Sequence, residues 1–213
     1  MITVKAITVN PFQENTYVLY DETGECLIID PGIYTGTEQN MLVDFISQNK
    51  LRPVKLLLTH AHIDHILGNR FVFDQYGLSP ELHKGEESIL DYAPTVAAKY
   101  GFQYDVSPKV GTYLEDNQKI GFGNSELLTI LAPGHSPAHI CFYTAKEGIL
   151  IGGDVLFYNS IGRTDLPGGD HDTLIKSINE RLFVLPDETV VYPGHGPETN
   201  IGFEKKTNPF LTA

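Results

Sequence analysis

The chain has 213 residues, which suits a single globular unit, and 41% of them are hydrophobic while 20% are charged. This balance is typical of a protein with a packed interior and excludes a disordered or fibrous chain. The net charge of −12 leaves no basic surface that would hold a phosphate backbone, so we expect no nucleic-acid partner.

The sequence carries no sign of export or of membrane insertion. The N-terminus lacks a basic segment followed by a long apolar run, and no apolar stretch approaches the roughly 20 residues that span a bilayer. We therefore expect a cytoplasmic protein without a membrane partner. Cys26 and Cys141 sit singly in apolar, strand-like runs, which favours buried, inert thiols over a zinc or redox pair.

The first part of the sequence places strand patterns before helical ones. Three runs rich in β-branched and aromatic residues predict antiparallel strands at 2–9, 15–21 and 25–30. A helix is predicted over 37–50, with Thr37 at its N-cap. A short buried strand at 54–58 and a helix that ends at Gly77 follow.

The rest of the sequence repeats this order after a weaker stretch. A short strand is predicted at 80–84, two polar helical pieces at 85–92 and 94–101, and a turn-rich junction from 103 to 124. The elements predicted beyond it are strands at 126–133, 139–144, 148–153 and 189–193 and a helix over 172–183. Two such halves predict an α/β fold in a single domain over residues 1–213, an αββα sandwich of two mixed sheets with helices on the outer faces.

The stretch THAHIDH, from Thr59 to His65, concentrates metal-ligand side chains directly after the strand predicted at 54–58. In three further places an apolar strand is followed by Gly or Pro and then by one such side chain: His135, Asp154 and His195. Strand ends are where α/β folds place ligands, because the sheet fixes the side chains while the loops leave space in front of them. Five histidines and two aspartates are therefore expected to meet in one pocket.

The spacing within THAHIDH suits two ions. His60 and His62 are two positions apart in an extended segment, so they point the same way and can bind one metal. Asp64 and His65 fall where the next helix begins, and a turn there directs them to a second position. The set contains no cysteine, and its imidazoles and carboxylates suit zinc, iron or manganese in a catalytic site with bound water.

Structural roles for the same residue types stay open at this point. Asp64 would also serve as an N-cap, Asp154 as a turn residue, and each Pro-Gly-His as a surface turn. Three other histidines are expected outside the ligand set. His83 is expected in a strand or at the surface, His139 in a structural hydrogen bond, and His171 at a helix start.

The order His-x-His-x-Asp-His, followed by His, Asp and His, resembles the motif of the metallo-β-lactamase superfamily, and the likeness covers nearly the whole chain. The resemblance implies two divalent cations, zinc above all, with iron or manganese as alternatives. It assigns His60, His62 and His135 to the first metal, Asp64, His65 and His195 to the second, and Asp154 as the bridge between them. Asp64 and Asp154 are then the catalytic carboxylates, and a hydroxide held between the two cations would be the nucleophile for hydrolysis.

Within the superfamily, residues 10–32, 162–170 and 193–211 resemble the short glyoxalase II-like hydrolases, also called hydroxyacylglutathione hydrolases. The resemblance implies that a metal-bridging hydroxide cleaves a small thioester, such as S-lactoylglutathione, to a hydroxy acid and a thiol. The residues after the bridging aspartate are then expected to contact the substrate: Tyr158, Arg163 and Thr164. Longer members carry a C-terminal helical domain that binds glutathione, whereas Lys205 and Lys206 are the only basic residues after His195 here. The preferred thiol therefore stays open.

The segment GRTD, residues 162–165, also resembles persulfide dioxygenases, which keep a single iron on the ligands of the first site. A mononuclear-iron oxidoreductase is therefore the alternative to the hydrolase. A nuclease is disfavoured by the net charge of −12, and an exported β-lactamase by the lack of a signal peptide. The sequence sets neither the native metal nor the oligomeric state.

Overall fold

Two compact units make up the computed structural model of the protein, which describes residues 1–212. The first unit contains Met1–Leu114 together with Gly121–Glu126, and the second contains Glu115–Ile120 and the chain from Leu127 onward. The division after Leu114 falls inside the turn-rich section that the sequence predicts as a junction. That the whole chain forms a single domain stays a prediction.

The first unit is built on a six-stranded mixed sheet in the order β1-β2-β3-β4-β5-β6. Its strands are β1 Thr3–Val9, β2 Glu14–Tyr20, β3 Glu25–Ile29, β4 Arg52–Leu57, β5 Pro80–His83 and β6 Thr112–Leu114. The first three strands pair antiparallel, as predicted. The pairs from β3 to β6 are parallel, since helical crossovers connect these strands.

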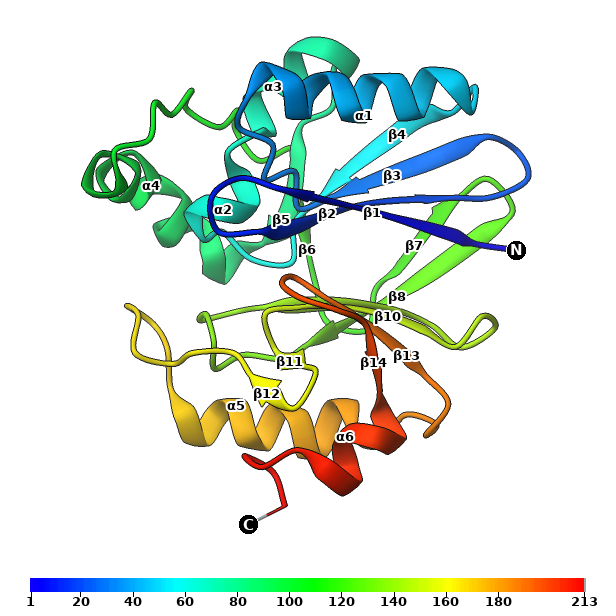
Figure 1. Cartoon of the computed structure of the whole chain (residues 1–213), viewed down its shortest axis with the longest axis vertical. Coiled ribbons are helices and arrows are strands. Elements are labelled where there is room, and N and C mark those ends of the chain that lie inside the picture. The colour runs from blue at the N-terminus through cyan, green and yellow to red at the C-terminus, as the bar shows by residue number, and fades with distance from the viewer. Residues whose placement is uncertain (213) are drawn as a thin grey trace. The chain divides into compact units, whose positions relative to one another are not determined.

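Helices return the chain between the parallel strands of the first unit. They are α1 Gly36–Gln48, α2 Ile63–Ile66, α3 Asn69–Tyr76 and α4 Glu87–Tyr100, with a 3₁₀ turn at Lys84–Glu86 before α4. Figure 1 shows α1 and α3 along one face of the sheet. Leu42 of α1 and Val72 of α3 join Ile28 and Leu56 of the strands in one buried core. Burying a side chain of this size stabilises a fold by roughly 1.5–3 kcal/mol.

Two helix predictions were wrong in detail. The N-cap of α1 is Thr35 rather than Thr37, because Thr35 and Glu38 form a capping box in which each side chain accepts a hydrogen bond from the other's backbone amide. The two polar pieces predicted at 85–92 and 94–101 are one helix, α4, which runs through Pro94. Its buried alanines Ala93 and Ala97 pack into the core, and this packing outweighs the hydrogen bond that Pro94 cannot donate.

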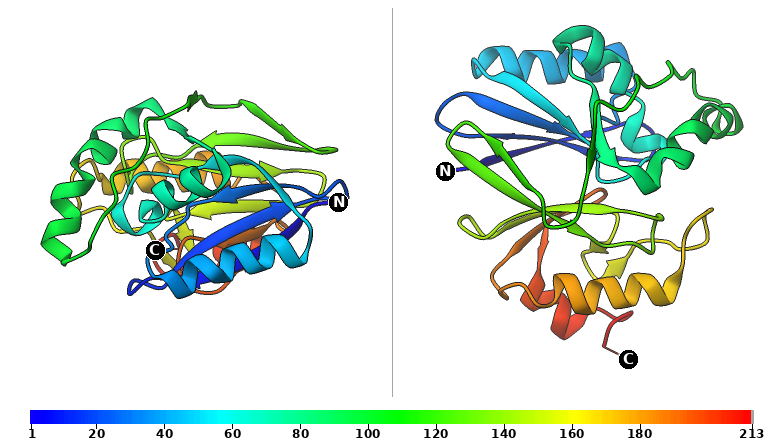
Figure 2. Two further views of the ribbon diagram at one scale, coloured as in Figure 1. Left: turned by 90° about the horizontal axis from the view of Figure 1, so that it is seen from above. Right: turned by 180° about the vertical axis from the view of Figure 1, so that it is seen from behind.

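The second unit carries another six-stranded mixed sheet, in the order β14-β13-β10-β9-β8-β7. Its strands are β7 Lys119–Phe122, β8 Ser125–Leu131, β9 Ile140–Thr144, β10 Ile149–Gly153, β13 Val190–Pro193 and β14 Thr199–Asn200. A small hairpin pairs β11 Leu156–Phe157 with β12 Ser160–Ile161. The helix α5 His171–Ser177 continues into a π-helical turn, Ile178–Leu182, and packs on one face of the sheet (Figure 2). The predicted α/β class with two mixed sheets and helices is therefore confirmed.

A last helix, α6 Ile201–Thr207, follows β14 and was not anticipated from the sequence. Its Ile201 is buried in the core of the second unit. Both cysteines are buried free thiols, as predicted, and burial raises the pKa of Cys26 to about 12. Among residues 1–212, no helix combines the length and the apolar character that crossing a bilayer requires.

The carboxylate of Asp21 fastens the tip of the β7–β8 hairpin inside the first unit. It is buried and accepts hydrogen bonds from the Asn124 amide at 2.7 Å, the Ser125 hydroxyl at 2.9 Å and the Thr23 amide at 2.9 Å. Burial alone would raise the pKa of this carboxyl, but the hydrogen bonds outweigh burial and lower the pKa from 3.8 to about 2. The ionised form is therefore tied to the folded state.

We expect Asp21 to make stability depend on pH. Because its folded pKa lies below its unfolded pKa of 3.8, the contribution is complete above about pH 4 and is lost as the pH falls towards 2. Urea unfolding of the wild type and of Asp21→Asn should differ by about 2 kcal/mol at pH 6. That difference should shrink between pH 4 and pH 2. A difference that stays constant across this window would refute the assignment.

The capping box gives a second prediction about stability. Replacing an N-cap threonine by alanine costs about 1 kcal/mol, so Thr35→Ala should lower the free energy of unfolding by that amount in urea. Thr37→Ala is the matched control, since Thr37 is exposed in the first turn of the same helix and caps nothing. Equal losses in the two variants would contradict the cap at Thr35.

Candidate metal centre

Four of the predicted ligands lie together where β4 ends and α2 begins, in the first unit. The rings of His60 and His62 lie edge to face with their centroids 4.7 Å apart, and the His60 and His65 centroids are 4.2 Å apart. His65 Nε2 lies 3.8 Å from Asp64 Oδ2. The N-cap of α2 is His62, so Asp64 does not cap this helix. The structure thus groups the ligands of THAHIDH within one short segment.

A buried aspartate at the end of β3 orients two of these histidines. Asp30 accepts hydrogen bonds from the Thr59 amide at 2.7 Å and from the Thr59 hydroxyl at 2.6 Å, and its Oδ2 lies 3.2 Å from His65 Nδ1. The Thr59 hydroxyl lies in turn 2.9 Å from His60 Nδ1. A histidine that binds a metal through one ring nitrogen commonly has the other held by a carboxylate or a hydroxyl in this way. The ligand atoms of Asp30, His60 and His65 lie within 4.8 Å of one another.

A second buried carboxyl, Glu14 of β2, lies against the same histidine. Its Oε1 is 3.7 Å from His65 Nδ1, and its Oε2 accepts a hydrogen bond from the Thr16 hydroxyl at 3.0 Å. Burial raises the pKa of Glu14 well above its usual value, and the Asp30 and Asp64 carboxylates raise it further, whereas His65 acts in the opposite direction. Several acidic groups therefore share one buried region, which favours a cation there.

The backbone around Asp64 is fixed by close packing. Asn10 donates from its side-chain amide to the carbonyl oxygens of Gly32 and Asp64, each at 2.9 Å. A Cβ atom at Gly32 would lie 2.1 Å from the Asp64 carbonyl oxygen and 2.2 Å from Glu14 Oε2. Only glycine fits there. The fully buried Glu86 fixes the neighbouring turn, since it accepts a hydrogen bond from the Ala61 amide at 3.1 Å.

The other three predicted ligands lie together in the second unit. Asp154 follows β10, His195 follows β13, and His135 lies in the loop after β8. Asp154 Oδ2 is 3.5 Å from His135 Nε2 and also 3.5 Å from His195 Nε2. One carboxylate oxygen therefore lies between two imidazoles that come from different strand ends.

Hydrogen bonds and one glycine hold this second group. His135 Nδ1 lies 2.8 Å from the Arg163 carbonyl oxygen, which fixes the ring with Nε2 towards Asp154. His139 is fully buried and accepts a hydrogen bond from the Asp154 amide at 3.1 Å, so its predicted structural role is confirmed. A Cβ atom at Gly162 would lie 1.9 Å from the Asp154 carbonyl oxygen, so the chain can pass here only as glycine.

The remaining histidines lie outside both groups. His83 ends β5, and its Nδ1 accepts a hydrogen bond from the Gly85 amide at 3.1 Å. His171 is exposed at the start of α5, where Asp170 is the N-cap.

The three predicted substrate residues lie between β11 and α5. Tyr158 is in the turn of the β11–β12 hairpin, and Arg163 and Thr164 are in the loop that follows β12. Tyr158 is 50% exposed, and its ring stacks on Phe203 at 5.2 Å between centroids. Arg163 is exposed and forms a bidentate ion pair with Asp165, with both N···O distances at 2.7 Å. Thr164 is half-buried. Their contact with a substrate stays a prediction.

Sequence reasoning missed the residues that orient the ligands. Asp30 directly follows the apolar strand ECLII, and an aspartate after an apolar strand is the same pattern that identified Asp154. The sequence alone could therefore have pointed to Asp30. Glu14 and Glu86 follow no local pattern, because tertiary contacts alone bring Glu14 to His65 and Glu86 to the Ala61 amide.

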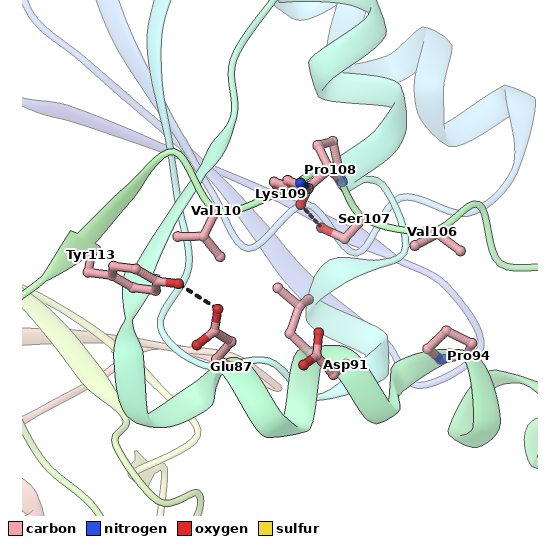
Figure 3. A pocket seen from close by; sticks show the side chains of 10 residues that line it. Glu87, Asp91, Pro94, Val106, Ser107, Pro108, Lys109, Val110 and Tyr113 are labelled. Atoms are coloured by element: carbon pink, nitrogen blue, oxygen red, sulfur yellow. Dashed lines mark hydrogen bonds between the residues drawn. The ribbon is translucent and has the colours of Figure 1, made fainter.

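A cavity of about 530 Å³ lies elsewhere in the first unit, between α4 and the chain leading to β6 (Figure 3). Its lining combines apolar side chains, such as Leu90 and Val106, with the carboxylates of Glu87 and Asp91. The Tyr113 hydroxyl donates to Glu87 across it at 2.5 Å. None of the predicted ligands lines this cavity.

Comparison with known proteins agrees with the ligand pattern. Residues 9–195 match the model of the metallo-beta-lactamase superfamily. A probable metallo-hydrolase of Bacillus subtilis is 38% identical over 97% of this chain and 96% of its own length. A hydroxyacylglutathione hydrolase of Haemophilus influenzae is 35% identical over 99% of this chain and 98% of its own length.

Solved structures give the same fold. The B3 metallo-beta-lactamase BLEG-1 superposes with a TM-score of 0.91 at 38% identity, covering 99% of this chain and 100% of its own. TTHA1623 in a di-iron-bound form superposes with a TM-score of 0.88 at 36% identity, covering 98% of this chain and 100% of its own. The relatives support a metal-dependent hydrolase, and the chain belongs to the metallo-beta-lactamase superfamily.

Proposed function

We propose that the protein is a metal-dependent hydrolase that cleaves a small thioester, such as S-lactoylglutathione, to a hydroxy acid and a thiol. The observation that carries the proposal is the position of Asp154, whose Oδ2 lies 3.5 Å from both His135 and His195. A carboxylate oxygen between two imidazoles is the arrangement expected of a ligand shared by two metals. The relative of Haemophilus influenzae, which matches almost end to end, supports the thioester class.

The proposed ligand sets follow the superfamily motif. The first metal takes His60, His62 and His135, the second takes Asp64, His65 and His195, and Asp154 bridges them. Imidazole and carboxylate donors without cysteine fit two divalent cations in a catalytic site. Zinc is the proposed metal, and iron and manganese suit the same donors; the di-iron form of TTHA1623 supports iron as a competitor.

Two cations held there would supply a nucleophilic water at neutral pH and would polarise the thioester carbonyl. The contribution of the chain is orientation. Asp30 holds His65 and, through Thr59, His60, while the Arg163 carbonyl oxygen holds His135. Preorganised ligands of this kind need no rearrangement when the reaction occurs.

On the substrate side we propose contacts from Tyr158, Arg163 and Thr164. The Arg163 guanidinium is paired with Asp165 at the surface, and exposed pairs of this kind are weak enough to exchange partners. Arg163 would then bind a substrate carboxylate. Lys205, one of the basic residues after His195, is less exposed than Arg163 and is held both by Asp187 at 2.7 Å and by the Leu185 carbonyl oxygen at 3.4 Å. Glutathione recognition therefore falls to the loop more than to this tail.

The remaining proposals concern partners and location. We propose a small-molecule substrate, no nucleic-acid or membrane partner, and a cytoplasmic location. The oligomeric state is left open.

Metal analysis with a substrate panel tests the proposal. The purified protein should carry two metals per chain and should cleave S-lactoylglutathione or a thioester of another thiol. β-Lactam hydrolysis is the second candidate, favoured by the 38% identity to a B3 metallo-beta-lactamase, so the panel includes a chromogenic cephalosporin. One iron per chain with oxygen uptake on glutathione persulfide would replace the hydrolase by the dioxygenase.

We expect Asp64→Ala and Asp154→Ala each to lower thioester hydrolysis by more than about 100-fold, because each removes a charged ligand of the proposed pair of metals. Bound metal should fall as well, which elemental analysis would measure. Asp172→Ala is the control, since Asp172 is an exposed aspartate in α5. Hydrolysis that survives either ligand substitution would rule out the two-metal mechanism.

Asp30→Asn should weaken metal binding without removing a proposed ligand. Losing a carboxylate that orients a metal-binding histidine typically costs about 10- to 100-fold in metal affinity. Titration against a competing chelator would measure the loss. Asp21→Asn removes a buried, hydrogen-bonded carboxylate elsewhere in the first unit, so it should destabilise the fold and leave metal affinity unchanged.

A further inference from the structure

A buried carboxylate in the last helix is fully hydrogen-bonded, and one of its partners belongs to a distant hairpin. Glu204 of α6 is 0% exposed. Its carboxylate accepts hydrogen bonds from the Thr199 hydroxyl at 2.6 Å, the Asn208 side-chain amide at 2.8 Å and the Asn159 backbone amide at 3.1 Å. Hydrogen bonds to a buried charge are strong, and losing a partner is costly. The bond to Asn159 joins positions 45 residues apart.

Asn159 lies at the tip of the β11–β12 hairpin, in a left-handed conformation with φ of 53°. Two further bonds from the α6 segment hold the same tip. The Asn208 side-chain amide donates to the Ser160 carbonyl oxygen at 3.0 Å, and the Thr207 hydroxyl donates to the Asn159 side chain at 3.2 Å. Several hydrogen bonds therefore hold the tip of the hairpin to the α6 segment, and the one from the Asn159 amide ends on the fully buried carboxylate of Glu204.

The other end of this hairpin starts at the proposed bridging ligand. Its base is closed by a hydrogen bond from the Gly162 amide to the Val155 carbonyl oxygen at 3.2 Å, next to Asp154. The Phe157 ring lies edge-on to the His195 ring at 6.3 Å. The hairpin is therefore fixed at its base beside the ligands and at its tip by α6.

The residue between these two attachments is Tyr158. Its ring lies nearly parallel to that of Phe203 of α6, with an interplanar angle of 8°. It is 50% exposed, and its hydroxyl makes no hydrogen bond within residues 1–212. A phenol held by stacking on one side, with its hydroxyl open to solvent, is prepared to donate a hydrogen bond to a ligand.

We propose that Glu204 is a positioning residue for substrate binding, which acts through the Asn159 amide and Phe203 to hold Tyr158 in place at the tip of the hairpin that begins next to Asp154. The inference rests on the proposed function in so far as Tyr158 contacts the thioester. The substrate group it would meet is a hydrogen-bond acceptor in the acyl or thiol part. Glu204 itself is buried and touches neither substrate nor metal.

A fluorescence experiment tests the positioning without any activity. The chain contains no tryptophan, so Tyr158→Trp introduces a single tryptophan at the hairpin, which can be excited selectively and can stack on Phe203. Adding Glu204→Gln should loosen the hairpin, raising the acrylamide quenching constant by about twofold or more and lowering the anisotropy. Lys205→Gln is the control, because Lys205 holds the same helix from another side through Asp187. Quenching that Glu204→Gln leaves unchanged would overturn the proposal.

Kinetics on the metal-loaded enzyme test the consequence for the substrate. Glu204→Gln should raise KM by about five- to tenfold, the effect of losing one ordinary hydrogen bond to the substrate, with kcat and metal content within about twofold of wild type. In a Tyr158→Ala background the same substitution should change KM no further, since the group it positions is gone. If Glu204 had only a structural role, Glu204→Gln would lower the melting temperature, and its effect on KM would multiply with that of Tyr158→Ala. That result would overturn the proposal.

Two further measurements keep the proposal testable if Glu204→Gln does not fold or if the wild-type enzyme cleaves no thioester. If Glu204→Gln does not fold, Phe203→Ala removes the stack and leaves the buried carboxylate in place; it should raise KM, and no change in KM would count against the proposal. If the wild-type enzyme cleaves no thioester, the proposed function fails, while the quenching experiment still decides whether Glu204 holds the hairpin.

Discussion

The buried carboxylate of Asp30 is the constraint on which the ligands of the first unit depend. A carboxyl group in the interior is tolerated only when its oxygens are hydrogen-bonded. Asp30 meets this condition because it accepts hydrogen bonds from Thr59 and lies against His65. The same contacts orient the rings of His60 and His65, so satisfying the buried carboxyl and orienting the predicted ligands depend on the same hydrogen bonds. Its positive φ of 48°, unusual for a residue other than glycine, adds to the cost of this position. In the second unit other groups orient the predicted ligands. The Arg163 carbonyl oxygen contacts the His135 ring, and His139 accepts a hydrogen bond from the Asp154 backbone amide.

The way acidic groups are distributed changes what the net charge means. A charge of −12 excludes a phosphate-binding surface only to the extent that the acidic groups lie on the surface. Several of them do not: Glu14, Asp30, Glu86, Asp154 and Glu204 are all buried. Burial raises the pKa of Glu14, and the neighbouring carboxyls of Asp30 and Asp64 raise it further. A resident cation would offset that repulsion directly, so part of the negative charge read from the composition belongs to the metal centre.

Sequence reasoning succeeded where a rule depends on neighbours along the chain. The candidate ligands stood out because they follow apolar strands, and their binding of a metal stays a prediction, whereas the strands and most helices followed their own periodicity. The N-cap at Thr35 could also have been predicted, since Thr35 and Glu38 fit the capping-box spacing and Thr37 does not.

Other features of the structure depend on tertiary contacts and could not be predicted from neighbours along the chain. Pro94 predicts a helix break by local rules, and only the burial of Ala93 and Ala97 overrides it. The hydrogen bond between Glu204 and Asn159 has no local signal, because 45 residues separate the two.

The chemistry of this site and the choice of its substrate rest on different residues. The predicted ligands lie at the ends of strands and contact buried groups, and the relatives support a metal-dependent hydrolase as the reaction class. The candidates for recognition sit on the segment from β11 to α5, which is exposed and is held by bonds to α6 and by an ion pair within the loop. Exposed segments of this kind change their side chains at little cost to the fold. Similarity in the ligand pattern therefore supports a metal-dependent hydrolase strongly and the thiol only weakly, and specificity must be sought in how firmly Tyr158 and Arg163 are held.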